Sequence, residues 1–293
     1  MNEKYKKIIK NQKVRLKILE LIRWLPSKFI VKIQYKMKLG RNLNLQAPKR
    51  FTEKIQSYKL SYKNDLLHRC VDKYDVREYV AEKGLTSILV KSFGCYSTFN
   101  EIDFEKLPNQ FVMKTTNGSQ TNIICKNKEE LNINKTEIQF KNWLKRDQFI
   151  FGREWAYKGL DSKILIEELL VDANSSDIKD YKFLCFNGKP EFIIYDSDRF
   201  SGHRRNIYDL NWNKLNVLTD CDQIEETIEK PDKLEELINI SKILSADFPF
   251  VRVDLYYVNS QIYFGELTFY PWSGYVSFEP DEFDLTLGKL FPE

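Results

Sequence analysis

Metal-binding and nucleophilic side chains are scarce in this 293-residue chain. Histidine occurs only twice, at His68 and His203, and the five scattered cysteines form no CxxC motif. A zinc site or a Cys–His nucleophile pair is therefore disfavoured. The odd number of cysteines indicates reduced thiols and a cytoplasmic protein. The sequence offers no constellation for covalent catalysis.

Motifs that would decide the class of function are also missing. No apolar run approaches the roughly 18 to 20 residues of a membrane span, and the first residues lack a signal-peptide layout. Neither GxxxxGK(S/T) nor GxGxxG occurs, which excludes the Walker A loop and the dinucleotide-binding fingerprint. Internal repeats and low-complexity segments are absent.

Charge is distributed unevenly along the chain. Residues 1–41 carry thirteen Lys or Arg and two acids, a net charge of +11, whereas the remaining 33 basic and 40 acidic residues give −7. The basic segment also holds many apolar residues. It suits either peripheral contact with an anionic membrane face or an ordinary helix packed on the body. The acidic body disfavours nucleic acid as a partner. The oligomeric state stays open.

Periodicity and turn signals predict an α+β fold. Antiparallel hairpins with separate helices favour this class over a doubly wound sheet. Helices are expected in residues 1–60 (with breaks at Pro26, 39–40 and 47–48), 65–83, 136–148 and 232–246. Strands are expected at residues 85–93, 111–114, 123–126, 163–170, 181–186 and 191–195, the last two joined by Asn187-Gly188.

The hairpin FVRVDLYYVNSQIYFGELTF at residues 250–269 carries charged side chains at even spacing. Strand alternation places Arg252 and Asp254 on one face. A three-residue loop, Asn259-Ser260-Gln261, would pair Asp254 with Glu266 and Arg252 with Thr268. A two-residue loop would send the two carboxylates to opposite faces. Facing carboxylates need compensation, either from a divalent cation or from Arg252 on a solvated face.

Two further strand ends suit a nucleotide. Lys114 precedes the small, glycine-containing loop 115–122, which forms either a phosphate-binding loop or a plain hairpin turn. The apolar strand 163–170 contains Glu167-Glu168, where a purine and a ribose hydroxyl could bind. Lys182 alternates with Tyr181 and Phe183 and so points to the opposite face of the strand. There it would either face phosphates or be an ordinary surface lysine.

The order of Lys114 with its loop, Glu167-Glu168, Lys182 and the Asp254/Glu266 hairpin resembles the ATP-grasp superfamily of carboxylate–amine ligases. The segments DKYDVREYV (72–80), LPNQFVMKTTNGS (107–119) and DYKFLCFNGKP (180–190) are similar to the TupA-like ATP-grasp family, named for teichuronopeptide synthesis. This resemblance covers most of the chain and implies two α+β subdomains that clamp ATP. The regions would be 1–60 (basic, helical), 61–110 (small α/β), 111–170 (phosphate loop) and 171–293 (metal site).

The resemblance implies roles for the matching residues. ATP phosphates would be bound by Lys114, Lys182, Ser119 and Gln120. Adenine would lie at Glu167, Glu168 and Leu170, and ribose at Asp180. Asp254 and Glu266 would hold Mg²⁺, with Thr268 where the superfamily commonly has Asn. Arg252 would neutralise charge on the transferred phosphoryl group.

The implied reaction forms an amide through an acyl phosphate. The acid would be a uronic acid of a surface (capsular) polysaccharide or its precursor, and the other substrate a small amine or amino acid. In DRFSGHRRNIYD, the basic side chains Arg199, Arg204 and Arg205 would bind the carboxylate or acyl phosphate. The enzyme would be cytoplasmic, or peripheral at the inner membrane face through residues 1–41.

Two rival functions stay open. Asp196-Ser197-Asp198 matches the DxD pattern of glycosyltransferases, although such enzymes also need an N-terminal nucleotide-binding βαβ region and this N-terminus predicts helices. An ATP-dependent glycan kinase would keep the ATP site and change the acceptor.

Overall fold

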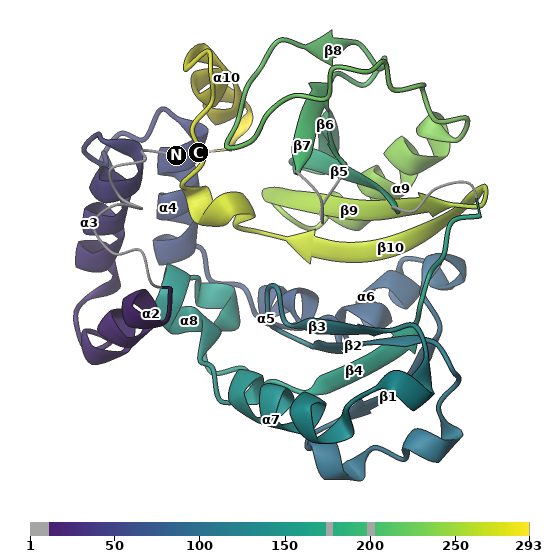
Figure 1. Ribbon diagram of the computed structural model, residues 1–293. Coiled ribbons are helices and arrows are strands. Elements are labelled where there is room, and N and C mark those ends of the chain that lie inside the picture. Colours follow the sequence, from purple (N-terminus) through teal and green to yellow (C-terminus); the bar gives the residue numbers. More distant parts are fainter. Residues whose placement is uncertain (1–11, 174–177, 198–202, 293) are drawn as a thin grey trace.

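The protein is built around two antiparallel sheets that lie one above the other in Figure 1. The computed structural model describes residues 12–173, 178–197 and 203–292. One sheet has four strands in the order β1-β4-β2-β3, and the other has six in the order β10-β9-β5-β6-β7-β8. The α+β class expected from the sequence is confirmed, whereas the four region boundaries remain a prediction. No helix in the described ranges is both long and apolar enough to cross a bilayer.

The N-terminal helices break where the sequence predicts. They are α2 (Gln12–Leu21), α3 (Ser27–Leu39) and α4 (Phe51–Ser61). Pro26 precedes α3, and Gly40 ends it with a left-handed φ of 74°. The start of α4 packs tightly against α10 (Glu282–Leu290), because a Cβ on Gly288 would lie 2.0 Å from the carbonyl oxygen of Lys49. The contact joins an N-terminal helix to the last helix of the described chain.

The single helix expected over residues 65–83 is wrong, because the structure has two: α5 (Asp65–Val71) and α6 (Val76–Glu82). Between them, a carboxylate oxygen of Asp72 accepts from the backbone N–H groups of Tyr74 (2.9 Å) and Asp75 (3.0 Å). Such side-chain bonds compete with the helical ladder. The break lets the backbone N–H of Lys73 donate to Thr116 O at 2.7 Å.

The four-stranded sheet carries the predicted phosphate loop between two of its strands. Its strands are β1 (Ser92–Tyr96), β2 (Phe111–Thr115), β3 (Asn122–Cys125) and β4 (Ile164–Glu168). The strand expected over 85–93 is largely wrong, since residues Thr86–Ile88 form a 3₁₀ turn and β1 begins at Ser92. One face is covered by α7 (Ile133–Leu144), whose Phe140 and Trp143 pack against Phe111 and Met113 of β2. The short α8 (Gln148–Gly152) follows α7.

The six-stranded sheet carries most of the predicted site. Its strands are β5 (Lys179–Phe186), β6 (Lys189–Ser197), β7 (Arg204–Tyr208), β8 (Lys214–Leu215), β9 (Phe250–Val258) and β10 (Gln261–Thr268). The predicted Asn187-Gly188 turn is confirmed, with φ of 49° and 73° at the two residues. The predicted helix at 232–246 is α9 (Leu234–Ser245), which packs on this sheet and buries Leu237 and Leu244.

The β9–β10 hairpin corrects the predicted loop and confirms the predicted pairing. The loop has two residues, Asn259 and Ser260, since Val258 pairs with Gln261. Alone, this register would separate the carboxylates. A β-bulge at Gly265 adds one unpaired residue to β10 and restores the pairing of Asp254 with Glu266. A side chain at Gly265 would crowd this bulge, because its Cβ would lie 2.9 Å from Asp254 O.

Candidate nucleotide and metal site

Lys182 lies at the centre of a buried cluster of carboxylates from three adjacent strands. Its Nζ contacts the carboxylate of Asp180 and lies 3.2 Å from Asp254 Oδ2 and 3.8 Å from Asp196 Oδ2. Lys182 on β5 is paired with Asp254 on β9, and this register brings their side chains together. Only 6% of the Lys182 side chain is exposed. The surface alternative for this lysine is therefore wrong.

Arg252 binds the predicted metal carboxylates together. Its guanidinium donates to both oxygens of Asp254, at 2.7 and 2.6 Å, and to Glu266 Oε1 at 3.5 Å. Thr268 Oγ1 accepts from Arg252 at 3.1 Å and donates to Glu266 at 3.2 Å. Burial would lower the pKa of Arg252, but the charge of Asp254 outweighs it and raises that pKa. The side chains placed together by the sequence pattern are thus in contact.

A second buried ion pair lies on the neighbouring strands β6 and β7. Arg205 Nε donates to Asp196 Oδ1 at 2.6 Å, and its Nη1 donates to Asp220 at 2.7 Å. Burial would raise the pKa of Asp196, but hydrogen bonding to His203 and the charge of Arg205 hold it well below its usual value. Asp196 is therefore engaged by basic side chains of the chain itself.

The predicted acceptor arginines do not share one environment. Arg205 is buried in the Asp196 pair, whereas Arg204 is half-exposed and lies 3.1 Å from Glu226. Arg199 and Asp198, the second acid of the DxD pattern, lie outside the described residues. Arg204 therefore remains the described candidate of the three for binding an acidic substrate.

The strand end predicted for adenine is tied to the phosphate-loop lysine. Glu167 is buried, and its carboxylate pairs with Lys114 Nζ and with Arg77 Nη1, the latter at 3.1 Å. Glu168 is exposed, and its backbone N–H donates to Lys91 O at 2.9 Å. The backbone N–H of Glu168 is therefore already bonded within the protein. Leu170 follows the strand and is half-buried.

The loop after Lys114 is held from within by threonine side chains. The hydroxyls of Thr115 and Thr121 are in contact, and Thr115 N donates to Thr121 O at 3.0 Å. A Cβ on Gly118 would lie 2.1 Å from each hydroxyl oxygen, so this position requires glycine. Ser119 and Gln120 are exposed at the tip, and Gln120 has a left-handed φ of 56°. The loop is compact and presents its tip to solvent.

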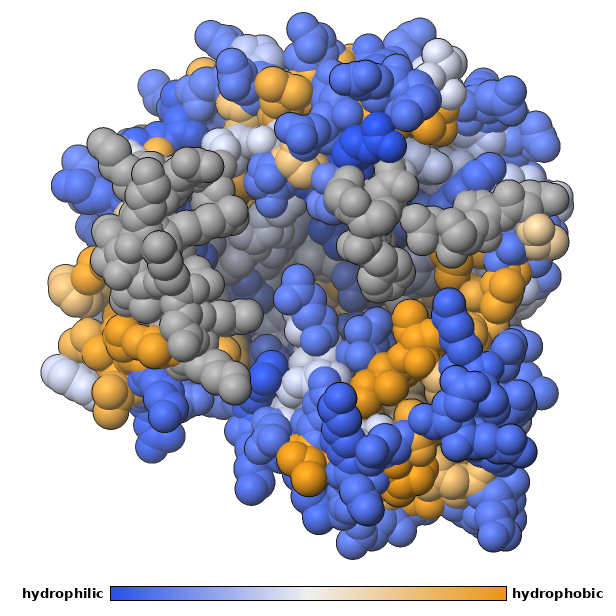
Figure 2. All heavy atoms as spheres, in the orientation of Figure 1, coloured by the Kyte–Doolittle hydropathy of each residue, from blue (hydrophilic) through white to orange (hydrophobic). Residues whose placement is uncertain are grey.

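Lys73, to which the sequence assigned no role, connects this loop to the hairpin of the other sheet. Its Nζ donates to Gly118 O at 3.0 Å and lies 3.5 Å from Glu266 Oε2. Burial would raise the pKa of Glu266, but the charges of Lys73 and Arg252 outweigh it and lower that pKa to about 2. The phosphate loop and the predicted metal carboxylates therefore face each other. Figure 2 shows the surface hollowed between the parts that carry the two sheets.

The chemistry of this set fits Mg²⁺ with a nucleotide better than a metal held by protein alone. Within the described residues, no three His, Cys, Asp or Glu side chains converge to hold a metal ion. Asp254 and Glu266 supply two adjacent carboxylates. Mg²⁺ typically takes one or two carboxylates and completes its shell with phosphates and waters. Lys73 lies 3.5 Å from Glu266 and Lys182 lies 3.2 Å from Asp254, so positive charge adjoins both carboxylates.

Comparison with known proteins assigns the chain to a family. The sequence model of the TupA-like ATP-grasp family matches residues 53–292. The chain belongs to the TupA-like ATP-grasp family. No curated protein matches it.

Similar solved structures are ATP-grasp chains of distant sequence. They include D-alanine–D-alanine ligase from Bacillus anthracis (21% identity, TM-score 0.42, 68% of this chain and 57% of that chain). Phosphoribosylamine–glycine ligase from Thermotoga maritima has 14% identity, a TM-score of 0.42 and coverage of 72% and 52%. The ligase PsnB, solved with Mg and ADP, has 11% identity, a TM-score of 0.38 and coverage of 68% and 50%. The chain thus spans less than two thirds of each of these proteins.

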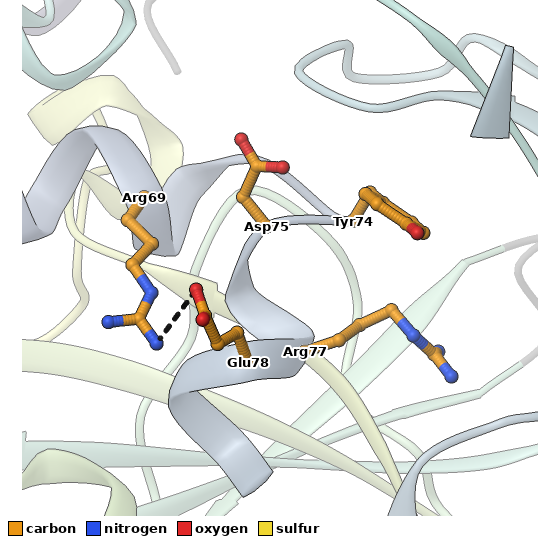
Figure 3. Close-up of a pocket in the computed structure, with 5 residues that line it drawn as sticks. All are labelled: Arg69, Tyr74, Asp75, Arg77 and Glu78. Carbon is orange, nitrogen blue, oxygen red and sulfur yellow. Dashed lines mark ion pairs between the residues drawn. The ribbon is translucent and has the colours of Figure 1, made fainter. Parts of the chain in front are cut away.

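This TupA-like chain has a pocket, beside the candidate nucleotide site, that the sequence did not predict. It measures about 500 Å³ and is lined by Arg69, Tyr74, Asp75, Arg77 and Glu78. Figure 3 shows the ion pair of Arg69 with Glu78 on one side and Arg77 extending away on the other. Burial raises the pKa of Asp75. Because Arg77 also pairs with Glu167, it connects the pocket wall to the strand end predicted for adenine.

A fully buried lysine holds the segment that follows β10. Lys59 Nζ donates to the carbonyl oxygen (2.6 Å) and hydroxyl (2.8 Å) of Ser273, whose hydroxyl donates to Glu154 at 2.5 Å. Trp272, Ser273 and Gly274 have left-handed φ values of 51°, 54° and 67°. Three such residues in succession are unusual, and the two non-glycines are strained. The α4 helix therefore fixes the backbone just beyond Thr268.

Lys59 is expected to make stability depend on pH. Burial lowers its pKa from 10.5 to about 7, although Glu154 opposes the shift. Between these two values the unfolded chain binds the proton and the folded chain does not, so the stability of the folded state rises with pH. Relative to Lys59→Met, the wild type should gain thermal stability from about pH 7 to about pH 10. Thermal unfolding of both proteins across this range measures the difference.

The matched control for this experiment is Lys63→Met, which changes an exposed lysine two residues beyond α4. Its stability difference from the wild type should vary little over the same pH range. A Lys59→Met difference that is equally flat would show that the buried amine does not lose its proton.

Proposed function

We propose that the chain is an ATP-dependent, ADP-forming ligase that joins a carboxylate to an amine. Family membership supports ATP-grasp chemistry. The observation that carries the proposal is Lys73, which lies within 3.0 Å of the phosphate loop and 3.5 Å of Glu266. A triphosphate bound between the two sheets would thus meet lysines from one side and the carboxylate pair from the other.

In this proposal each basic group has a place along the nucleotide. Lys114 and the loop tip at Ser119 and Gln120 bind phosphates from the four-stranded sheet, and Lys73 does so from the turn between α5 and α6. Lys182 binds phosphates from the six-stranded sheet. The strand end at Glu167, Glu168 and Leu170 borders adenine, and Asp180 lies toward ribose. Asp254 and Glu266 hold Mg²⁺, which when bound neutralises phosphate charge and orients the transferred group. Thr268 supports Glu266 by donating a hydrogen bond to it.

The reaction balances without a covalent enzyme intermediate. A substrate carboxylate oxygen attacks the terminal phosphorus of ATP, the bond to ADP breaks, and an acyl phosphate forms. The amine then attacks the acyl carbon, phosphate leaves, and a proton is released as the amide forms. Arg252 would stabilise negative charge at the transferred phosphoryl group, and positioning would supply much of the acceleration. Arg204, with Arg199, would attract the acidic substrate, whereas Arg205 is paired with Asp196 and Asp220.

The proposed acid is a uronic acid of a surface polysaccharide or its precursor, and the proposed amine is a small amine or amino acid. The family's association with teichuronopeptide synthesis supports this choice. Measuring ADP release for uronic acids paired with amines tests it, with hydroxylamine added to trap the acyl phosphate as a hydroxamate. ADP release without hydroxamate would instead indicate a glycan kinase. Stabilisation by a metal with a UDP-sugar, but not by Mg-ATP, would indicate a glycosyltransferase.

A further inference from the structure

Large apolar side chains are exposed together on α2 and α3. Half of the twelve exposed large apolar side chains in the described part of the chain fall within residues 14–33. On α2, Val14, Ile18 and Leu21 recur at the spacing of one helical face. Leu21 and Trp24 are each 76% exposed. The remaining two are Phe29 and Ile33, one turn apart on α3.

The two helices are nevertheless anchored to the body through other side chains. Tyr35 is fully buried and its hydroxyl bonds Thr52 at 2.8 Å. Gln34 Nε2 donates to Phe151 O at 3.1 Å, and Arg153 donates to the carbonyl oxygens of Ile22 and Arg23. The expected packing of this segment on the body is therefore present on one side only. Figure 2 shows hydrophobic side chains gathered on the flank where α2 and α3 lie in Figure 1.

The same flank is strongly basic. Its exposed cations are Lys17, Arg23, Lys28, Lys32 and Lys36, and Glu20 is the one acid between residues 12 and 40. Within the described residues, none of these five cations forms an ion pair. Residues 1–11 add four lysines and one glutamate to the sequence of this region. Apolar and basic side chains thus alternate on one anchored surface.

We propose that this surface, the exposed side of residues 14–36, docks on an anionic lipid bilayer. Amphipathic segments with Lys or Arg beside Trp, Phe and Leu bind the interface of such membranes. Tryptophan also favours the level of the headgroups, which suits Trp24 at the turn between the helices. A second copy of the chain would bring two positive surfaces together, and nucleic acid would leave the apolar side chains exposed. Membrane docking does not depend on the proposed function.

The full-length protein tests the proposal by cosedimentation with vesicles of phosphatidylcholine, with and without phosphatidylglycerol. Binding is expected with the anionic vesicles and should weaken as salt is added. The charge-reversal pair Lys28→Glu/Lys32→Glu should weaken binding by more than about tenfold. The pair Leu21→Ala/Trp24→Ala should weaken the apolar part of the binding, which is the part that remains at high salt. Thermal unfolding of each variant confirms that it is folded.

Matched controls change exposed side chains of the same kinds elsewhere. Lys135→Glu/Lys145→Glu on and beside α7 and Ile138→Ala/Val171→Ala should leave vesicle binding unchanged. The proposal is overturned if the wild type does not cosediment with anionic vesicles, or if the control substitutions weaken binding as much as the test substitutions. It is also overturned if the α2–α3 variants abolish self-association or nucleic-acid binding instead. Loss of vesicle binding with normal ADP release would leave the proposed ligase function intact.

Discussion

Replacing Lys182 with methionine is expected to lower the free energy of unfolding by about 3–5 kcal/mol. The lysine is the cation between Asp180, Asp254 and Asp196, whose side chains are at most 4% exposed. Methionine fills similar space but leaves buried carboxylates without this neutralising charge. Denaturant unfolding of the variant and the wild type measures the change.

The control is Lys179→Met, which alters an exposed lysine on the same strand. Its effect should stay within about 0.5 kcal/mol, the usual range for surface substitutions. If Lys182→Met were as stable as the wild type, the buried cluster would not need its central cation. If the variant were stable but no longer bound Mg-ATP, the role of Lys182 would be to bind the nucleotide and not to stabilise the fold.

Replacing Asp254 with asparagine is expected to reduce ADP formation by about 100-fold or more. Asparagine keeps the shape of the side chain but removes the negative charge that faces Glu266 across the hairpin. A single neutral amide is a weaker partner both for Arg252 and for the proposed Mg²⁺. Steady-state ADP release gives the rate. Thermal unfolding with ATP, in the presence and absence of Mg²⁺, shows whether the metal-dependent stabilisation is lost.

Thr268→Val provides the comparison on the same hairpin. It removes one hydroxyl that bonds Glu266 and Arg252 but leaves both charges in place. We expect a decrease of at most about 30-fold, smaller than that of Asp254→Asn, since the hydroxyl makes two hydrogen bonds that contribute about 1 kcal/mol each. Equal losses in the two variants would indicate that the packing of the hairpin, rather than the charge of Asp254, controls the reaction. A folded Asp254→Asn protein with normal activity would exclude the proposed metal site.

The sequence predicted the contacts of the hairpin better than its backbone. Pairing of Asp254 with Glu266 follows from alternation and from the need to keep apolar residues on the core side. The loop length was wrong because a two-residue turn and a bulge together give the same pairing as a longer loop. Gly265 was the available signal, since an isolated glycine within a strand pattern often marks a bulge.

Contacts between distant segments were harder to foresee. Lys73 lies in a matched motif, but its contact with Glu266 depends on the break that Asp72 makes between two helices. Arg205 was expected to bind substrate, but its guanidinium is paired with Asp196 and Asp220. Counting charges along a chain does not reveal which cation meets which carboxylate. That choice is made by strand order and burial.

The bulge at Gly265 also divides β10 into two parts that need not change together. In an uninterrupted strand, adding or removing one residue exchanges inside and outside for every side chain beyond it. Here the residues from Gln261 to Phe264 follow the turn, and those from Glu266 to Thr268 follow Asp254 on β9. The register of residues 261–264 is therefore set by the turn, whereas Glu266 and Thr268 keep the register that places them opposite Asp254 and Arg252. The bulge at Gly265 makes a two-residue turn compatible with a site that requires Asp254 and Glu266 on the same face of the hairpin.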